Sequence, residues 1–489
     1  MICRDRFDVV ILGAGPAGAV LAERLSRKGY RAALVERHPG PRYAIGETLP
    51  PSVNLLLNRT GILPSSSALE FPRTTGNLSA WGSKEATFHP HAADMRSHGF
   101  QVERARFDGL LLQAARTAGV ELFAGCRPAE MRHIEPGCWK VVLALPDGQR
   151  QEIETRFLCD ATGRARVLAG KLRLRARACG HLLGLVAYWD VAADTAQPDG
   201  CNTLVESLPG GWVYTARLGD GRRVAGWMTD RDLLPPNLRK SAQQAYLHAL
   251  RQTKHVRHRL RKARCNSEVK IFAANPTLLD SSCGADWLLV GDAACTVDPL
   301  CSQGVQKAVT SALAAAAVVH TVLAQPASRA AAMEFYREKE SAGFHSHLDA
   351  LARYYRREQR WSGRPFWKRR HANLPGAGPA PQTETGPRRP QLQAEDRIMR
   401  APAAKIVVRP VIQGEFIAEK LVVVSPRAQR GLRYCGEVCV PELVELLDRR
   451  PTVAAVVQQY RRLHAGVSSA ALRDGLAQLL ALGVIEASR

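Results

Sequence analysis

The chain has 489 residues, too many for one ordinary domain, so two or three domains are expected. Hydrophobic residues make up 46% of the chain, enough for a large buried core, and this excludes a mainly disordered protein. The formal net charge of +23 lies largely in residues 239–264 and 353–371, and indicates either a solvated basic surface or a docking surface for an acidic partner.

Several classes of protein are not expected. No nucleic-acid recognition motif accompanies the charge. The N-terminus lacks the pattern of a signal peptide. The most apolar window, residues 308–323, is shorter than the roughly 20 residues of a spanning helix and predicts a buried helix. The 12 cysteines are scattered without a C-x-x-C pair, which favours reduced thiols and no metal site. We expect a cytoplasmic protein that does not insert into a membrane.

The first elements predict the opening of a parallel sheet. Residues 7–12 are a short apolar run that predicts a strand, residues 17–28 have helical spacing, and residues 31–36 predict a second strand. Residues 141–158 alternate between apolar and polar around a Pro-Asp-Gly turn and predict a hairpin. Residues 183–228 contain more strand-like runs.

The remaining elements predict the domain organisation. We expect a mixed sheet on the substrate side, mainly from residues 70–100 and 175–275, then a strand at 287–290 and a long helix from about Gly304. Residues 1–372 would bind cofactor and substrate. Residues 373–395 are rich in proline, glycine and polar residues, which is typical of a linker. Residues 396–489 predict a small winged-helix-like α+β domain, with strands at 405–411 and 420–425 and helices near 440–448, 452–463 and 468–482.

A glycine motif, Gly13-Ala-Gly15-Pro-Ala-Gly18, lies between the first strand and the first helix. Gly13 permits a tight turn, Gly15 lets the backbone approach a pyrophosphate, and Gly18 lets helix and strand pack closely. The free N–H groups of the helix then face the anion. Glu36 ends the second strand and is placed to accept hydrogen bonds from ribose hydroxyls. The unit predicts a dinucleotide site, which also includes Pro16, Ala17 and Arg37.

Later segments of the chain resemble a flavoprotein family, and this resemblance indicates that the dinucleotide is FAD. Arg104 heads a helix, Asp160 and Gly163 lie in a turn after a strand, and Gly291-Asp292 follows another strand. In this order they resemble the group A flavoprotein monooxygenases. The resemblance implies a Rossmann-like α/β fold in which Arg104 and Asp292 contact the pyrophosphate and ribitol chain of FAD. It also implies that a further segment lies against the isoalloxazine, with Pro299, Gln303, Gly304 and Val305.

Gly46 to Pro51, Arg360-Trp361 and Phe366-Trp367 resemble the tryptophan-halogenase-like branch, over about residues 5–371. Three departures matter. Trp212-Val-Tyr-Thr-Ala stands in place of the halogenase WxWxIP signature, Trp81 lies where the active-site lysine would fall, and Cys301 replaces a glutamate. A halogenase needs that lysine to direct hypohalous acid, so halogenation is not expected.

Residues 79–83, 212–216 and 298–304 resemble a narrower group, the flavoproteins that build tryptophylquinone cofactors. This resemblance implies hydroxylation of a tryptophan side chain in a partner peptide or small protein, with molecular oxygen as co-substrate. An acidic partner would suit the charge. FAD would be reduced by NAD(P)H directly or through a flavin reductase. Glu47, Trp81 and Ser302 are the candidate residues on the substrate side. Each also has a purely structural alternative: Glu47 as a hydrogen-bond acceptor in a loop, Trp81 as a core residue and Ser302 as a helix cap.

Other functions stay open. The first is hydroxylation of a small aromatic metabolite on the same scaffold, and the second is a flavin-bound maturation factor without oxygen chemistry. The tail resembles, more weakly, the PqqD-like peptide-recognition domains, which bind a leader peptide as an added strand. A role in packing alone is the alternative for the tail.

Overall fold

The structure is a computed structural model that describes residues 5–40, 44–63, 71–91, 98–191, 201–373 and 392–488. Most of the expected linker lies outside these residues. The chain forms two compact units: Met1–Val319 with Gly343–Gly378, and His320–Ala342 with Pro379–Arg489. The long helices α8 (Gly304–Ala324) and α9 (Arg329–Arg356) therefore contribute residues to both units, and each unit is described by itself.

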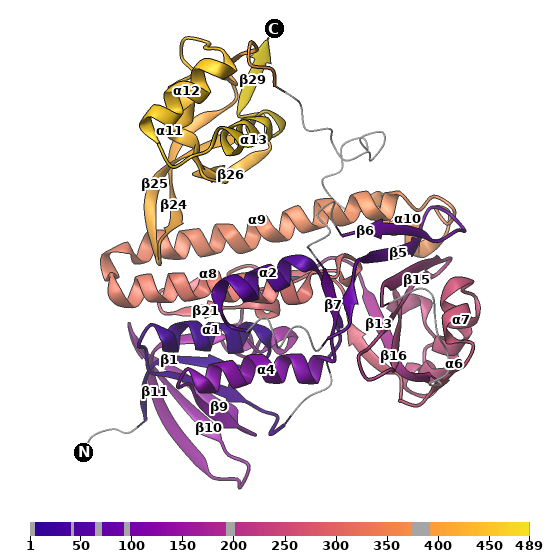
Figure 1. The fold of residues 1–489 in the computed structure, drawn as a ribbon. Helices are drawn as coiled ribbons and strands as arrows, with labels where there is room; N and C mark the ends of the chain where they lie inside the picture. The colour runs from indigo at the N-terminus through magenta and orange to yellow at the C-terminus, as the bar shows by residue number, and fades with distance from the viewer. Residues whose placement is uncertain are drawn as a thin grey trace. The chain divides into compact units, whose positions relative to one another are not determined.

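The first unit contains a mainly parallel sheet, in which β1 lies between β2 and β11 and β11 pairs with β21 (Figure 1). The predicted hairpin is confirmed as β10 and β11. The sheet consists of β1 (Arg6–Leu12), β2 (Ala32–Glu36), β8 (Glu121–Ala124), β9 (Arg127–Glu135), β10 (Cys138–Ala144), β11 (Arg150–Asp160), β20 (Cys283–Gly284) and β21 (Trp287–Leu289).

Burial on both faces explains the apolar runs of this sheet. Val9 to Leu12 of β1 and Ala33 and Leu34 of β2 have no exposed surface. Helices α1 (Pro16–Arg27) and α4 (Arg104–Thr117) pack against each other beside the sheet (Figure 1). The expected order of strand, glycine turn, helix and strand is therefore confirmed. Because β1, β11 and β21 are parallel, their carboxyl ends lie at one edge.

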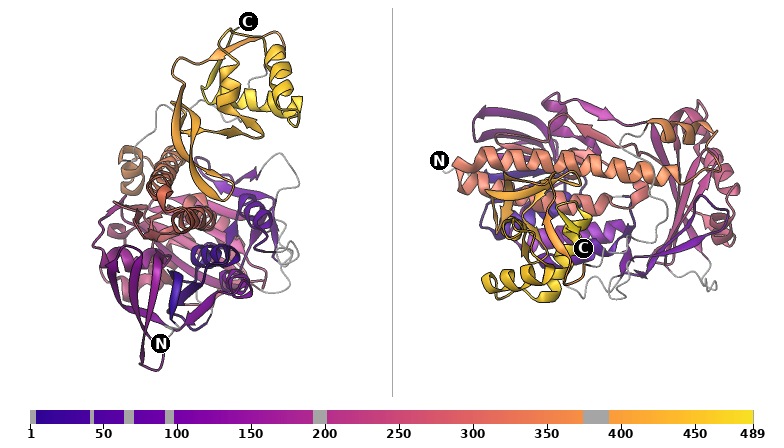
Figure 2. Two further views of the ribbon diagram at one scale, coloured as in Figure 1. Left: turned by 90° about the vertical axis from the view of Figure 1, so that its left-hand side faces the viewer. Right: turned by 90° about the horizontal axis from the view of Figure 1, so that it is seen from above.

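A second, mixed sheet lies at the opposite end of this unit (Figures 1 and 2). Helices α6 (Leu238–Arg251) and α7 (His255–Leu260) cover one face, where Tyr246 packs in the core. On the other face, an aromatic cluster forms around Trp212, Tyr355, Phe366 and Trp367. The strands are β5 (Gly76–Ala80), β6 (Thr87–Pro90), β13 (Leu182–Val191), β14 (Thr203–Leu208), β15 (Gly211–Arg217), β16 (Arg223–Asp230), β17 (Ala263–Cys265) and β18 (Lys270–Ala273).

Short elements complete the first unit. Two three-stranded sheets lie beside the larger ones, with the strand orders β3–β7–β4 and β12–β19–β22. The elements are β3 (Thr48–Leu49), β4 (Arg73–Thr74), β7 (Gly99–Gln101), β12 (Ala176–Ala178), β19 (Thr277–Leu279), β22 (Cys295–Thr296), α2 (Pro51–Thr60), α5 (Val167–Lys171) and α10 (Pro365–Asn373).

Helix α8 begins at Gly304, as the sequence predicted, and is longer than the apolar window at residues 308–323. It has 21 residues, so by length and apolar composition alone it is long enough to cross a membrane. The apolar window lies within this helix, which adds the turn Gly304 to Lys307 before it and Ala324 after it. Within the structure, 61% of its most apolar window is buried, which is typical of a core helix.

The second unit has its own core. The expected helices are confirmed, and the side chain of Thr452 caps α12 by accepting a hydrogen bond from the Ala455 N–H. The β24–β25 hairpin contacts residues 320–342, since the Ile417 N–H donates to Thr321 Oγ1 at 2.8 Å. The elements are β23 (Arg397–Arg400), β24 (Lys405–Gln413), β25 (Phe416–Ser425), β26 (Ala428–Leu432), β27 (Tyr434–Cys435), β28 (Val438–Cys439), β29 (Ile485–Ser488), α11 (Val440–Glu445), α12 (Val453–Leu463) and α13 (Ser469–Ala481).

A buried ion pair joins α10 to the second sheet of the first unit. Arg370 donates from both terminal nitrogens to the Asp230 carboxylate, at 2.8 and 3.0 Å. Neighbouring Arg369 contacts Asp230 and, on the surface, Asp232. The Asp230 side chain is 3% exposed and that of Asp232 52% exposed. Helix α10 therefore forms two arginine–aspartate ion pairs, a buried one with Asp230 and an exposed one with Asp232.

We predict that Asp230→Asn lowers the free energy of unfolding by about 3–5 kcal/mol, because it leaves the Arg370 guanidinium buried without its counter-charge. The matched variant Asp232→Asn should cost about 0–1 kcal/mol, since water screens that pair. Denaturant unfolding of both variants measures the difference. Equal losses would contradict this account of α10.

Candidate flavin site

The site begins where three strand ends meet in the first unit. The Ala161 N–H donates to the Leu12 carbonyl at 2.7 Å, and the Val290 N–H donates to the Asp160 carbonyl at 2.8 Å. The turns after β1, β11 and β21 are thereby held side by side. These are the three turns that the sequence analysis assigned to one cofactor.

Glycine is required in two of these turns because the backbones approach so closely. Gly13 has φ +94°, and a β carbon there would lie 2.6 Å from the Ala161 oxygen. A β carbon on Gly18 would lie 1.9 Å from the Gly13 oxygen. At Gly291, with φ +64°, it would lie 2.9 Å from the Ala17 β carbon. Side chains at these positions would separate the three turns.

The N-terminus of α1 is open toward this meeting point. Gly15 precedes the helix with extended backbone, Pro16 occupies the first turn, and no side chain caps the free N–H groups. Glu36 is held at the end of β2 because its carboxylate accepts from the N–H groups of Ala14, at 2.8 Å, and His38, at 3.0 Å. Arg37 is exposed and donates to His38 at 3.1 Å.

Arg104 and Asp160 are both engaged within the protein. Arg104 binds the carboxylate of Asp108, four residues later on α4, at 3.0 and 3.1 Å, and also donates to the Ile45 carbonyl. Asp160 accepts from the Thr162 N–H and hydroxyl and from the Leu168 N–H. Asp160 therefore shapes the turn that carries Gly163, and Arg104 holds the segment before Glu47.

Asp292 is half-exposed and forms an ion pair with Lys307 at 3.3 Å. Arg166 lies within electrostatic range of both Asp160 and Asp292. Its Nε and Nη2 atoms are buried and have no hydrogen-bond partner among the described residues. Burial and the charge of Arg164 lower its pKa. Sequence reasoning missed Arg166 and Lys307, because neither falls in a recognisable motif.

These features fit FAD. The open helix end and the glycine cradle suit a pyrophosphate, the unpaired nitrogens of Arg166 suit the same anion, and Glu36 suits ribose hydroxyls. Asp292 remains accessible for a hydroxyl of the ribitol chain. Bound FAD would supply the redox chemistry, and the protein would supply position and surroundings.

The segment expected to face the isoalloxazine is a tight turn at Pro299–Cys301, followed by Ser302 with φ +50°. Asp298 anchors it by accepting from the Leu300 N–H at 2.9 Å and the Tyr355 hydroxyl at 3.0 Å. Tyr355 accepts in turn from Trp212 Nε1 at 3.0 Å. Gln303 and Gly304 are exposed, and Val305 is buried. A chain of hydrogen bonds thus links the turn to the second sheet.

Burial sets the charge state of this turn. It raises the pKa of Asp298 to about 6, although the Leu300 N–H, Arg370 and Tyr355 favour the ionised form. It also raises the pKa of Cys301 to about 12, so this cysteine is a neutral thiol at physiological pH.

The other two candidates lie around the same aromatic cluster. Glu47 is buried, accepts from the Gly46 N–H at 2.9 Å and the Tyr188 hydroxyl at 3.1 Å, and has its pKa raised by burial. Trp81 packs on Trp367, with ring centroids 5.1 Å apart, and donates to the Tyr354 carbonyl at 2.9 Å. The indole N–H of Trp81 is therefore already used within the protein.

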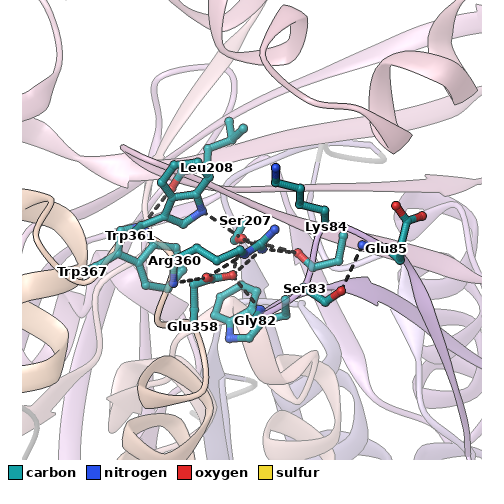
Figure 3. Close-up of polar contacts among 12 residues, drawn as sticks. Gly82, Ser83, Lys84, Glu85, Ser207, Leu208, Glu358, Arg360, Trp361 and Trp367 are labelled. Atoms are coloured by element: carbon teal, nitrogen blue, oxygen red, sulfur yellow. Dashed lines mark hydrogen bonds and ion pairs between the residues drawn. The ribbon is translucent and has the colours of Figure 1, made fainter.

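A buried network around Glu358 holds the chain next to Trp81 (Figure 3). Its carboxylate accepts from the Gly82 N–H at 2.7 Å, Ser207 at 2.6 Å and Arg360 at 2.5 Å. Burial raises the pKa of Glu358, but the bonds from Arg360 and Ser207 outweigh it and keep the pKa low. Trp361 and Trp367 donate to Ser207 and the Leu208 carbonyl. The Arg360-Trp361 and Phe366-Trp367 motifs thus connect α9, α10 and the second sheet.

Comparison with known sequences identifies relatives. Residues 72–396 match the family model for tryptophan halogenase, and residues 11–46 match that for an NAD(P)-binding Rossmann-like domain. A tryptophan 2-halogenase of Chondromyces crocatus is 30% identical over 67% of this chain and 64% of its own length, so the match spans just under two thirds of that relative. A protein of Marinomonas mediterranea named as an FAD-dependent oxidoreductase, LodB, is 27% identical over 75% of this chain and 98% of its own.

Solved structures confirm the fold. The flavin-dependent halogenase CmlS is 20% identical, with a TM-score of 0.80 and coverage of 100% of this chain and 96% of its own. The peptidyl tryptophan dihydroxylase QhpG, described as essential for tryptophylquinone cofactor biogenesis, is 26% identical with a TM-score of 0.72. That match covers 98% of this chain and 99% of QhpG. The predicted α/β fold with a Rossmann-like FAD-binding region is confirmed.

We predict that Gly18→Ala abolishes flavin binding, because the new methyl group would push α1 away from the Gly13 turn. Flavin absorbance of the purified protein measures the loss. Gly109→Ala in α4 is the matched control, since its β carbon meets nothing within 4 Å. It should keep its flavin and gain about 0.5–1 kcal/mol from helix propensity. Full flavin content in Gly18→Ala would contradict the proposed cradle.

We predict that Asp298→Asn stabilises the protein at pH 8. A carboxyl whose folded pKa is raised from 3.8 to about 6 binds its proton more tightly in the folded state. Its contribution to stability is therefore lost as pH rises from about 4 to above 6, at a cost of about 2–3 kcal/mol. The variant escapes that cost, so its melting temperature should exceed the wild-type value at pH 8 and converge with it near pH 4. A pH-independent gap, like that expected for the exposed Asp448→Asn, would contradict this.

Proposed function

This chain belongs to the tryptophan halogenase family of flavin-dependent enzymes, and from that premise we propose that it is an FAD-dependent monooxygenase. Its proposed substrate is a tryptophan side chain in a partner peptide or protein, and its product a hydroxylated tryptophan on the route to a tryptophylquinone cofactor. The peptidyl tryptophan dihydroxylase QhpG supports this choice of substrate, and the FAD-dependent oxidoreductase LodB supports oxidative flavin chemistry. The match to QhpG spans almost the whole of both chains.

The observation that carries the proposal is the chemistry of the side chains around the Pro299–Cys301 turn. At the places where halogenases have a lysine and a glutamate, this chain has Trp81, with its N–H bonded to Tyr354, and the neutral thiol of Cys301. Lys307 is committed to Asp292 and the Cys295 carbonyl. Leu300 and Cys301 of the turn pack against a cluster of aromatic and aliphatic side chains, which suits an indole ring and keeps water away.

Glu47 is the group that we propose to handle a proton. Oxygen transfer to a ring carbon leaves that carbon with both oxygen and hydrogen, and a proton must depart before the ring regains aromaticity. A buried carboxylate that accepts from Tyr188 is suited to take it, since burial raises the pKa of Glu47 above that of an ordinary glutamate. Tyr188 would orient Glu47, and Ser302 would end the turn against the substrate.

Halogenation is the competing activity, because the chain is 30% identical to a tryptophan 2-halogenase. The two reactions differ in product. A hydroxylase adds oxygen from dioxygen to the ring, whereas a halogenase adds a halogen and requires the halide. One reaction mixture with both dioxygen and bromide therefore distinguishes them.

We predict that the reduced enzyme adds labelled oxygen to tryptophan. The protein is incubated with FAD, a flavin-reducing system, bromide, isotopically labelled dioxygen and a tryptophan-containing partner, and the partner is analysed by mass spectrometry. Glu47→Gln should retain FAD but slow the reaction by about 100-fold or more. Glu103→Gln, at the start of α4, is the control. A brominated product, or no labelled oxygen on a competent partner, would overturn the proposal.

A further inference from the structure

In the folded unit, one short turn contacts both basic segments of the sequence. This turn, residues 82–85, lies between β5 and β6. On one side Glu85 binds Lys254 at 2.8 Å, and His255 bonds to the Lys84 carbonyl at 2.9 Å, both at the start of α7. On the other side the Gly82 N–H donates to Glu358 at 2.7 Å, just beyond α9 (Figure 3).

The contact at Gly82 is close. A β carbon there would lie 2.8 Å from the Arg357 oxygen, and Gly82 has φ +70°. The turn therefore lies directly on the end of α9. This short turn thus contacts two segments that are about 100 residues apart in sequence, one on each side of it.

The acidic groups of this region are used internally. Glu206 caps α7 by accepting from the N–H groups of Lys254, His255 and Val256, Glu358 binds Arg360, and Glu85 binds Lys254. Several exposed cations remain without an acidic partner in the described part of the chain. We call them the basic face: Lys84, Arg257, Arg261, Lys262, Arg353, Arg364 and Lys368.

The basic face adjoins the proposed reaction site. Trp81 precedes the bridging turn, and Trp361 lies between Arg353 and Arg364 in the chain. Both pack against the aromatic cluster that also receives Leu300 and Cys301 of the flavin-facing turn. Lys84, Arg364 and Lys368 of the basic face therefore lie close in sequence to side chains of that cluster, and the 82–85 turn connects them to α7.

We propose that the basic face docks an acidic segment of the protein substrate, which flanks the tryptophan to be oxidised. This inference rests on the proposed function. We choose an acidic partner because of charge complementarity. Unpaired cations attract an anionic chain and raise the rate at which it encounters the protein. A polypeptide is favoured over a nucleic acid because the substrate site next to the face suits an indole side chain of a peptide.

The test measures binding without turnover. The probe is a fluorescent peptide with one tryptophan flanked by glutamates, and its anisotropy gives the affinity at low and high salt. Two triple variants divide the face: Arg257→Glu with Arg261→Glu and Lys262→Glu, and Lys84→Glu with Arg364→Glu and Lys368→Glu. Each should weaken binding about tenfold or more at low salt, and the loss should shrink at high salt.

The matched control reverses three exposed arginines elsewhere, Arg59, Arg116 and Arg177, with the same change in net charge. Its binding should stay within about twofold of the wild type. Equal weakening by all three triples would overturn a localised docking face. Tighter binding of a single-stranded DNA of equal charge would overturn the polypeptide partner. If the glutamate variants do not fold, the corresponding glutamine variants take their place.

Failure of this inference is distinguishable from failure of the proposed function. If both triple variants lose peptide binding and the wild type transfers no oxygen, the docking face is supported and the hydroxylase function is contradicted. If the wild type transfers oxygen and both triple variants bind the peptide as the wild type does, the hydroxylase function is supported and the docking face is contradicted.

Discussion

The close approach of three backbone turns is the constraint on which the site depends. Gly13 contacts Ala161, Gly18 packs over Gly13, and Gly291 packs against Ala17, all at distances that exclude a β carbon. Parallel pairing of β1, β11 and β21 brings these turns to one edge, and the missing side chains let them close. The same closure leaves the N-terminus of α1 open for an anion.

Buried charges fix the elements that pack against the second sheet. Asp230 with Arg370 attaches α10 to the second sheet, and Glu358 with Arg360 attaches the 82–85 turn. Such pairs add little net stability, but removal of one partner is costly. They therefore hold the aromatic cluster in one position beside the Pro299–Cys301 turn. Asp298 joins the two systems, because it anchors that turn to Tyr355 and Trp212.

Local patterns predicted most of the fold. Continuous apolar runs marked β1 and β2, and the glycine motif placed the first helix, because these signals depend on neighbouring residues only. Arg166 was missed, since a buried unpaired guanidinium is recognisable only once its surroundings are known. The Asp298–Tyr355 bond spans 57 residues, and the bridge between the two basic segments needs a third, distant turn. The start of α8 at Gly304 was predicted, but its full length exceeds the apolar window because polar Gln306 and Lys307 belong to the helix.

The central claim is that these interlocked turns hold one FAD. Isothermal titration of the flavin-free protein tests it most directly, with FAD and NAD⁺ as separate titrants. The account predicts saturation at one FAD per chain, weaker FAD binding in Arg166→Gln, and no heat of binding with NAD⁺. An absence of FAD binding, or NAD⁺ binding as tight as that of FAD, would contradict it.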